Sequence, residues 1–212
     1  MRLYKITQIE TQKRNENRVS IYLDGAFAFG LNREVLHQNH LHEGDELSRK
    51  DIDNILLVEE IRAAKDKALR FLSCRDRSVL ELSAKLAERD FSEWVIEIVV
   101  RDFLRVGLLD DMRFARAFAQ AKMIQKPVAK RLLMHTLKIK GIEGESARLA
   151  VEEAYQDRSE VSVAGDLASR RLERLGNDSD LKVRKKISDF LARRGFSWET
   201  IRSVLSNLPE KE

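Results

Sequence analysis

The sequence is poor in the residues that cross-link a chain or break it into many turns. Its 212 residues include one cysteine, two prolines and nine glycines. The lone cysteine, Cys74, cannot form an internal disulfide, and so few prolines and glycines provide too few turns for an all-β fold. Long apolar runs are also missing, because the most apolar window, Trp94 to Val100, is interrupted by Glu97. A membrane-spanning helix needs roughly 18 apolar residues, so these absences together favour long helices of a globular protein.

The composition places the chain among folded proteins of a reducing compartment. Apolar residues make up 43% of the chain and charged residues 35%, and 39 Lys and Arg against 35 Asp and Glu give a net charge of +4. That balance provides enough apolar side chains for a core and excludes collagen-like and low-complexity chains. No apolar run of signal-peptide length follows Met1 to Lys5. We therefore expect a soluble, cytoplasmic protein.

No catalytic or cofactor-binding constellation is recognisable in the sequence. It lacks the glycine-rich nucleotide loop, the Gly-Lys-Ser/Thr phosphate loop and the His-Glu-x-x-His zinc motif. His37, His40 and His42 lie close together, but no second pair of metal ligands accompanies them. Asp110 and Asp111 are better explained as acids at a helix start, where the helix dipole favours them, than as a catalytic pair. We expect no enzyme activity, no catalytic residue, no metal and no cofactor.

The first part of the chain, residues 1–47, has the pattern of a small sheet. Apolar and polar residues alternate from Val19 to Leu23, Asp24-Gly25 is a strong hairpin turn, and Ala26 to Phe29 forms the return. Leu3 to Ile9 is a candidate third strand. We predict an N-terminal β-hairpin region followed by a short helix.

The remainder contains an internal repeat with a period of about fifty residues. Three segments carry large apolar residues at the same relative positions: Leu82, Leu86 and Phe91; Leu133, Leu137 and Ile142; and Ile187, Leu191 and Phe196. The last members of these sets are 51 and 54 residues apart, which is long enough for three short helices per unit. We expect these nine residues to be core residues.

Each segment also ends with the same helix stop signal. Asp90, Gly141 and Gly195 come directly before the last apolar residue of their segment. These residue types adopt the left-handed conformation that ends a helix, and the apolar residue after them can fold back on the last turn. The pattern therefore predicts a middle helix that ends at each of these positions.

These signals together predict a mainly α protein of tandem three-helix repeats, elongated and curved, preceded by the small N-terminal β-hairpin region. The expected segments are residues 1–47, a first helical unit over 48–108, a second three-helix unit over 109–155 and a third over 156–212. An elongated array of this kind suits a large partner better than a small substrate.

The positive charge is concentrated late in the chain. Residues 109–155 carry nine Lys and Arg against six acids, and residues 156–212 carry twelve against ten. Lys122 to Lys140 contains six basic residues and no acid, and Lys182 to Arg194 contains six basic residues and one acid. Basic stretches on two equivalent middle helices favour contact with phosphates or an acidic protein surface. The alternative, that they are only solvated helix faces, stays open at this point.

Several motifs, in their order along the chain, resemble those of the RecX family of bacterial recombination regulators. They span roughly residues 19 to 205 and comprise Val19 to Gly25 with Ala28 to Leu31, Arg75 to Leu82, Gly107 to Ala115, and Arg193 to Phe196 with Ile201. The resemblance implies a non-enzymatic modulator that binds the RecA recombinase, chiefly its filament on single-stranded DNA. It further implies restraint of filament growth, strand exchange, ATPase and co-protease activity, with a place in DNA repair and the SOS response.

On this interpretation the basic stretches supply the contacts to filament or DNA phosphates. The residues that we select are Lys130, Arg131, Lys138 and Lys140 in the second unit, and Lys185, Lys186, Arg193 and Arg194 in the third. The expected partners are the RecA filament and single-stranded or double-stranded DNA, and the chain is expected to be a monomer that does not bind membranes. The alternative function is that of a general nucleic-acid-binding helical repeat protein.

Overall fold

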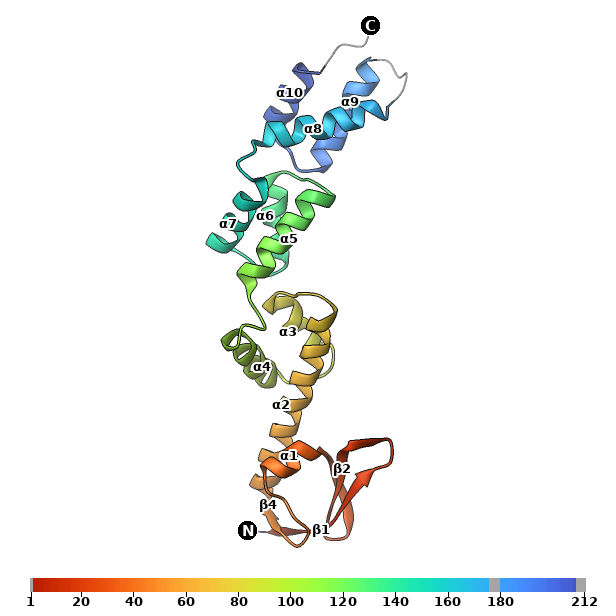
Figure 1. Ribbon diagram of the computed structural model, residues 1–212, viewed down its shortest axis with the longest axis vertical. Helices are drawn as coiled ribbons and strands as arrows, with labels where there is room; N and C mark the ends of the chain where they lie inside the picture. Colours follow the sequence, from red (N-terminus) through yellow and green to blue (C-terminus); the bar gives the residue numbers. More distant parts are fainter. Residues whose placement is uncertain (1, 176–179, 209–212) are drawn as a thin grey trace. The chain divides into compact units, whose positions relative to one another are not determined.

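The structure, a computed structural model, describes residues 2–175 and 180–208. Within these residues the chain forms four strands and ten helices (Figure 1). Its contacts divide it into two compact units, Met1–Arg75 with Ser83–Arg105, and Asp76–Leu82 with Val106–Glu212. The outermost residues of the first and last predicted segments, residue 1 and residues 209–212, lie outside the described residues, as do residues 176–179.

The first compact unit begins with a four-stranded antiparallel sheet. Its strands are β1 (Leu3–Gln12), β2 (Asn15–Leu23), β3 (Ala26–Asn32) and β4 (Glu46–Ser48), in the order β3-β2-β1-β4. The predicted hairpin is confirmed as β2 and β3, and the candidate third strand is confirmed as β1. The sheet is larger than the predicted hairpin region, because β4 pairs with the beginning of β1.

Two helices cover the apolar face of this sheet. The helix α1 (Arg33–Gln38) follows β3, and α2 (Arg49–Cys74) follows β4. A capping box starts α2, in which the Ser48 hydroxyl accepts from the Asp51 N–H and the Asp51 carboxylate accepts from the Ser48 N–H. The first turns of α2 belong to the same apolar cluster as the strands, and α2 continues without a break into the first group of three helices (Figure 1).

The remaining helices follow one another in groups of three. They are α3 (Val79–Ala87) and α4 (Glu93–Arg105), which follow α2; α5 (Asp111–Gln125), α6 (Lys130–Ile139) and α7 (Gly144–Tyr155); and α8 (Glu160–Glu173), α9 (Asp180–Arg193) and α10 (Trp198–Ser206). We call these groups the first, second and third repeats. In each repeat the first and third helices pack against each other. One continuous apolar core joins the second and third repeats.

The predicted repeat core is present in all three groups. Eight of the nine predicted positions are buried, and only Phe91 is half-buried. The predicted helix stops are also confirmed, because Asp90, Gly141 and Gly195 have φ angles of 63°, 81° and 82°. After α6, the Ile142 N–H donates to the Leu137 carbonyl at 3.0 Å and the Gly141 N–H donates to the Lys138 carbonyl at 2.9 Å. This is the Schellman arrangement, and the same two bonds close α9.

The two glycines at these stops also permit a close approach between consecutive repeats. A Cβ atom at Gly141 would lie 2.7 Å from the Leu80 Cβ, and one at Gly195 would lie 2.7 Å from the Leu132 Cβ. Leu80 and Leu132 are in the first turns of α3 and α6. The end of each middle helix therefore packs on the start of the preceding middle helix, inside the second compact unit. The predicted elongated, curved shape is a separate matter and stays a prediction.

Truncation of a repeat core residue should destabilise the second unit strongly. Leu137 is fully buried, so Leu137→Ala should lower the free energy of unfolding by about 2–5 kcal/mol through lost apolar contacts and a cavity. Ile139 on the same helix is 65% exposed, and Ile139→Ala should change that free energy by less than about 0.5 kcal/mol. Urea titration of both variants gives the comparison, and equal effects would contradict the repeat core.

The helix stops allow a second comparison. Gly195→Ala introduces a Cβ both at positive φ and against Leu132, whereas Gly107→Ala introduces one at a φ of 74° with nothing within 4 Å. The left-handed conformation alone costs about 1–2 kcal/mol, and overpacking adds about 1–3 kcal/mol. Gly195→Ala should therefore be more destabilising than Gly107→Ala by about 1 kcal/mol or more in urea titrations. Equal losses would mean that the close approach has no energetic importance.

Candidate functional site

The middle helix of the second repeat carries a basic exposed face. Arg131, His135 and Lys138 are exposed and follow one another at intervals of four and three residues, which places them on one side of α6. Leu133 and Leu137 are buried on the other side. Lys138 forms a loose ion pair, in which its Nζ lies 3.5 Å from the Glu143 Oε1 and both side chains are more than 60% exposed. Arg131 and Lys138 are therefore accessible to a partner.

The middle helix of the third repeat has a similar face. Lys185, Lys186 and Arg193 are exposed on α9, and Asp189 lies between them. Ile187, on the opposite side, is fully buried. The exposed faces of α6 and α9 together hold five of the eight basic residues selected from the sequence. We call these five residues, Arg131, Lys138, Lys185, Lys186 and Arg193, the basic faces.

Lys140 and Arg194, which occupy equivalent positions at the ends of α6 and α9, point into the protein instead. The Lys140 Nζ lies 2.5 Å from the Glu81 Oε1, and both side chains are about four-fifths buried, at 22% and 18% exposure. The same ammonium lies 4.9 Å from the centre of the Phe118 ring, a cation–π contact. Lys140 thus links the end of α6 to the first turn of α3.

Arg194 has the corresponding role one repeat later. Its Nη1 donates to the Pro127 carbonyl at 2.7 Å, and its own carbonyl accepts from the Ala129 N–H at 2.9 Å. Its guanidinium carbon lies 4.8 Å from the centre of the Phe190 ring. Burial lowers the pKa of the Arg194 guanidinium from its usual value. Arg194 therefore fixes the segment that precedes α6 against the end of α9.

Lys130 is also engaged within the protein. Its Nζ lies 5.1 Å from the centre of the Tyr155 ring, and its backbone N–H donates to the Glu160 Oε1 at 2.7 Å. The Tyr155 hydroxyl donates to the Val128 carbonyl at 2.7 Å, and burial raises the pKa of that hydroxyl. Lys130 lies beside this buried tyrosine, so it is less available than the residues of the basic faces. The binding role of all eight residues stays a prediction.

The acidic pair at the start of α5 has a structural role in two helices. Asp110 caps α5 through a bond from the Arg113 N–H, and the Asp111 Oδ1 accepts from the Val79 N–H of α3 at 2.8 Å. Burial raises the pKa of the Asp111 carboxyl, and the bond from Val79 opposes that shift.

Across the described ranges 2–175 and 180–208, no group of three or more His, Cys, Asp or Glu side chains is arranged to hold a metal ion. A search of those ranges also finds no helix with the length and apolar character to span a membrane.

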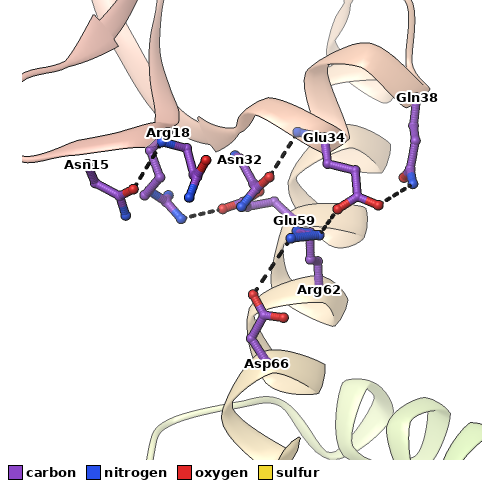
Figure 2. A network of polar contacts seen from close by, with 9 residues as sticks. Asn15, Arg18, Asn32, Glu34, Gln38, Glu59, Arg62 and Asp66 are labelled. Atoms are coloured by element: carbon purple, nitrogen blue, oxygen red, sulfur yellow. Dashed lines mark hydrogen bonds and ion pairs between the residues drawn. The ribbon is translucent and has the colours of Figure 1, made fainter. Parts of the chain in front are cut away.

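A polar network that the sequence did not reveal joins the sheet to α2 (Figure 2). The Arg18 Nη1 lies 2.7 Å from the Glu59 Oε1, and the other oxygen of Glu59 accepts from the Asn32 N–H at 2.8 Å. Arg62, one turn further along α2, pairs with Glu34 of α1. The opposite charges of Glu59 and Arg62 on one face of the helix were the only sequence signal that could have indicated this network. The network orients the sheet on α2 within the first compact unit.

Comparison with known proteins identifies the family. Three family models match the chain, described as the regulatory protein RecX N-terminal domain over residues 4–48, the first three-helix domain of RecX over 64–102 and the third over 159–205. The regulatory protein RecX of Clostridioides difficile (strain 630) is 35% identical over 96% of this chain and 95% of its own length. The chain belongs to the RecX family. The regulatory protein RecX of Bacillus subtilis (strain 168) is 29% identical over 96% of this chain and 76% of its own.

Solved RecX structures agree with the fold. A crystal structure of regulatory protein RecX is 28% identical, with a TM-score of 0.70 over 96% of this chain and all of that chain. RecX from Lactobacillus salivarius is 25% identical, with a TM-score of 0.61 over 71% of this chain and 97% of its own. The expected mainly helical fold of three-helix repeats is confirmed. RecX proteins are non-enzymatic modulators of the RecA recombinase, so the expected regulatory function is confirmed as well.

The different surroundings of Lys140 and Lys138 predict different effects on stability. Lys140→Ala removes a charged partner of the largely buried Glu81 carboxylate, so it should lower the free energy of unfolding by about 1–3 kcal/mol. Lys138→Ala removes only an exposed pair and should change that free energy by less than about 0.5 kcal/mol. Thermal and urea unfolding of the two variants measures both effects. Similar values would contradict a linking role for Lys140.

Proposed function

We propose that this chain binds the RecA filament on single-stranded DNA and restrains filament growth, strand exchange, ATP turnover and co-protease activity. The basic faces of α6 and α9 are the proposed contact. Their exposure on equivalent helices of two consecutive repeats is the observation that carries the proposal. A RecA filament is a regular polymer around a polyanion, so a chain with similar faces on successive repeats is suited to touch more than one of its subunits.

Electrostatics gives the proposed contact a definite salt dependence. Exposed charges interact over roughly a Debye length, about 10 Å at 0.1 M salt. Long-range attraction of the basic faces to phosphates or acidic protein surfaces therefore speeds encounter more than it adds affinity. Arg131, Lys138, Lys185 and Arg193 should accordingly act mainly on association, and their contribution should decline as salt rises.

The proposal extends to the setting and organisation of the chain. We propose that it acts as a monomer in the cytoplasm, where RecA acts. The segment over residues 1–47 and the units over 48–108, 109–155 and 156–212 are the proposed functional parts. Single-stranded or double-stranded DNA is a further proposed partner, either within the filament or alone.

The second candidate function is general nucleic-acid binding, which the same basic faces would favour. A protein of that kind binds DNA alone, and its affinity falls steeply with salt as counterions are released. The whole chain carries a net charge of only +4, which is modest for such a role. Membership of the RecX family favours the RecA filament as the principal partner.

Charge reversal of the basic faces tests the proposal. The variant Arg131→Glu, Lys138→Glu, Lys185→Glu, Arg193→Glu should bind the filament at least tenfold more weakly, since it loses four favourable charges and gains four unfavourable ones. Binding is measured to RecA alone, to single-stranded DNA alone and to the filament, at about 50 and 200 mM salt, together with RecA ATP turnover.

The matched control applies the same change in charge elsewhere. Lys13, Arg14, Lys50 and Arg89 are also exposed, so their reversal to Glu changes the net charge equally without altering the basic faces. This control should retain filament binding and inhibition of ATP turnover, apart from a small general loss at low salt. Equal losses in both variants would contradict a local contact, and binding to DNA alone without any effect on RecA would favour the second candidate function.

A further inference from the structure

A pocket of about 170 Å³ lies beside the basic face of α9, between the end of α5, α8 and α9. Its lining contains no acidic residue. Four of the lining residues are arginines: Arg170 and Arg171 of α8, Arg174 directly after α8, and Arg194 after α9. Phe190 of α9 also lines it. We call this the arginine pocket. Only Arg194 belongs to the set selected from the sequence, so the other three are additional candidates.

One buried donor in this pocket is unsatisfied. The Arg171 Nε is buried and has no hydrogen-bond partner among the described residues. The same description applies to Arg62 Nε in the first compact unit, but the Arg62 guanidinium is paired with the carboxylates of Glu34 and Asp66. Arg170, Arg171 and Arg174 form no ion pair with any residue in the described ranges. A buried charged donor without an acceptor is costly, and the positive charge of these three side chains is not offset by any acid that the described residues place against them.

Two of the four guanidinium groups are held in place before any ligand arrives. The guanidinium carbons of Arg171 and Arg194 lie 5.6 Å and 4.8 Å from the centre of the Phe190 ring. Each is a cation–π contact that restricts a long side chain. The bond from Arg194 to the Pro127 carbonyl fixes the second group further. A ligand therefore meets donors whose ordering cost is already met, which favours affinity.

The helix dipole of α8 does not explain the cluster. Basic residues in the last turn of a helix offset roughly half a negative charge at its C-terminus. Four guanidinium groups exceed that charge several-fold, and Arg194 comes from a different helix end. The surplus positive charge and the absence of acids from the lining favour an anion in this pocket.

We propose that the arginine pocket binds a phosphate group of a single-stranded nucleic-acid backbone. Arginine forks match phosphate oxygens in geometry as well as charge. Sites for drug-sized ligands have volumes of about 300 Å³ or more. The arginine pocket is smaller, so it accommodates one phosphate group rather than a whole nucleotide. Because Phe190 already contacts two guanidinium groups, it is committed to them and not to a base.

The pocket adjoins a second cavity, and this favours a chain-like ligand. A cavity of about 350 Å³ shares Ile124, Pro127 and Arg170 with the arginine pocket. It extends to Arg158, which pairs with Asp166. A free phosphate compound would need only the first pocket, whereas a backbone can continue into the second. This site deepens the proposed binding of single-stranded DNA and rests on that part of the proposed function, but it does not depend on RecA.

The test uses the full chain and a fluorescein-labelled (dT)20 oligonucleotide, with binding followed by anisotropy from about 50 to 200 mM salt. Arg171→Gln should weaken binding about tenfold, because a charged hydrogen bond is lost. It should also reduce the slope of log affinity against log salt by about 0.7, the value for one phosphate contact on a single strand. Arg202 is exposed on α10 outside the pocket, and Arg202→Gln is the matched control, expected to change affinity less than twofold.

Two further variants separate a built site from general charge. Arg171→Lys keeps the charge but removes the planar guanidinium fork, so it should weaken binding about threefold or more with the salt slope unchanged. The double variant Arg170→Gln, Arg174→Gln changes exposed residues only. It replaces the Arg171 variants in the test if circular dichroism shows that those fold poorly. This double variant should also weaken binding more than Arg202→Gln does.

Each outcome decides the proposal. Affinity of Arg171→Lys equal to that of the unchanged chain, or equal effects of Arg171→Gln and Arg202→Gln, would overturn it. Displacement of the oligonucleotide by inorganic phosphate, at an equal concentration of phosphate groups, would assign the pocket to free phosphate compounds. That result would overturn the proposal of a nucleic-acid ligand. Because RecA is absent from this experiment, its result is independent of filament inhibition, which is measured separately on the same variants.

Discussion

The second compact unit depends on the close approach between the end of one middle helix and the start of the previous one. Gly141 and Gly195 make this approach possible, because each has a positive φ and leaves no space for a Cβ against a leucine of the preceding repeat. The same residues terminate α6 and α9, so one local signal both ends a helix and sets the distance to its neighbour. The third helix of each repeat then begins at a defined place and packs on the first.

That junction also determines which basic residues are available to a partner. Lys140 and Arg194 directly precede the two glycines, and each reaches back to the preceding repeat, to Glu81 and to the Pro127 carbonyl respectively. The residues of the basic faces lie on the same two helices but point outward and are exposed. The basic stretches of the sequence are thus divided between structural links and the accessible basic faces that we propose as the contact with RecA. Arg194 belongs to both a link and the arginine pocket.

Local signals made much of this fold predictable. The apolar spacing and the left-handed stops depend on a few neighbouring residues, and both were confirmed. The short strand β4 was missed, because three residues are too few to show an alternating pattern. The inward direction of Lys140 and the arginine pocket were missed for a different reason: both require groups from other repeats or helices, such as Glu81 and Phe190, whose proximity exists only after folding.

Hydrogen exchange of the full chain, free and bound to the RecA filament on single-stranded DNA, tests the central claim most directly. The account predicts that binding protects backbone amides of α6 and α9 around the basic faces, while the sheet formed by β1 to β4 changes little. Protection confined to that sheet, with α6 and α9 unaffected, would contradict the assignment of the basic faces as the contact surface.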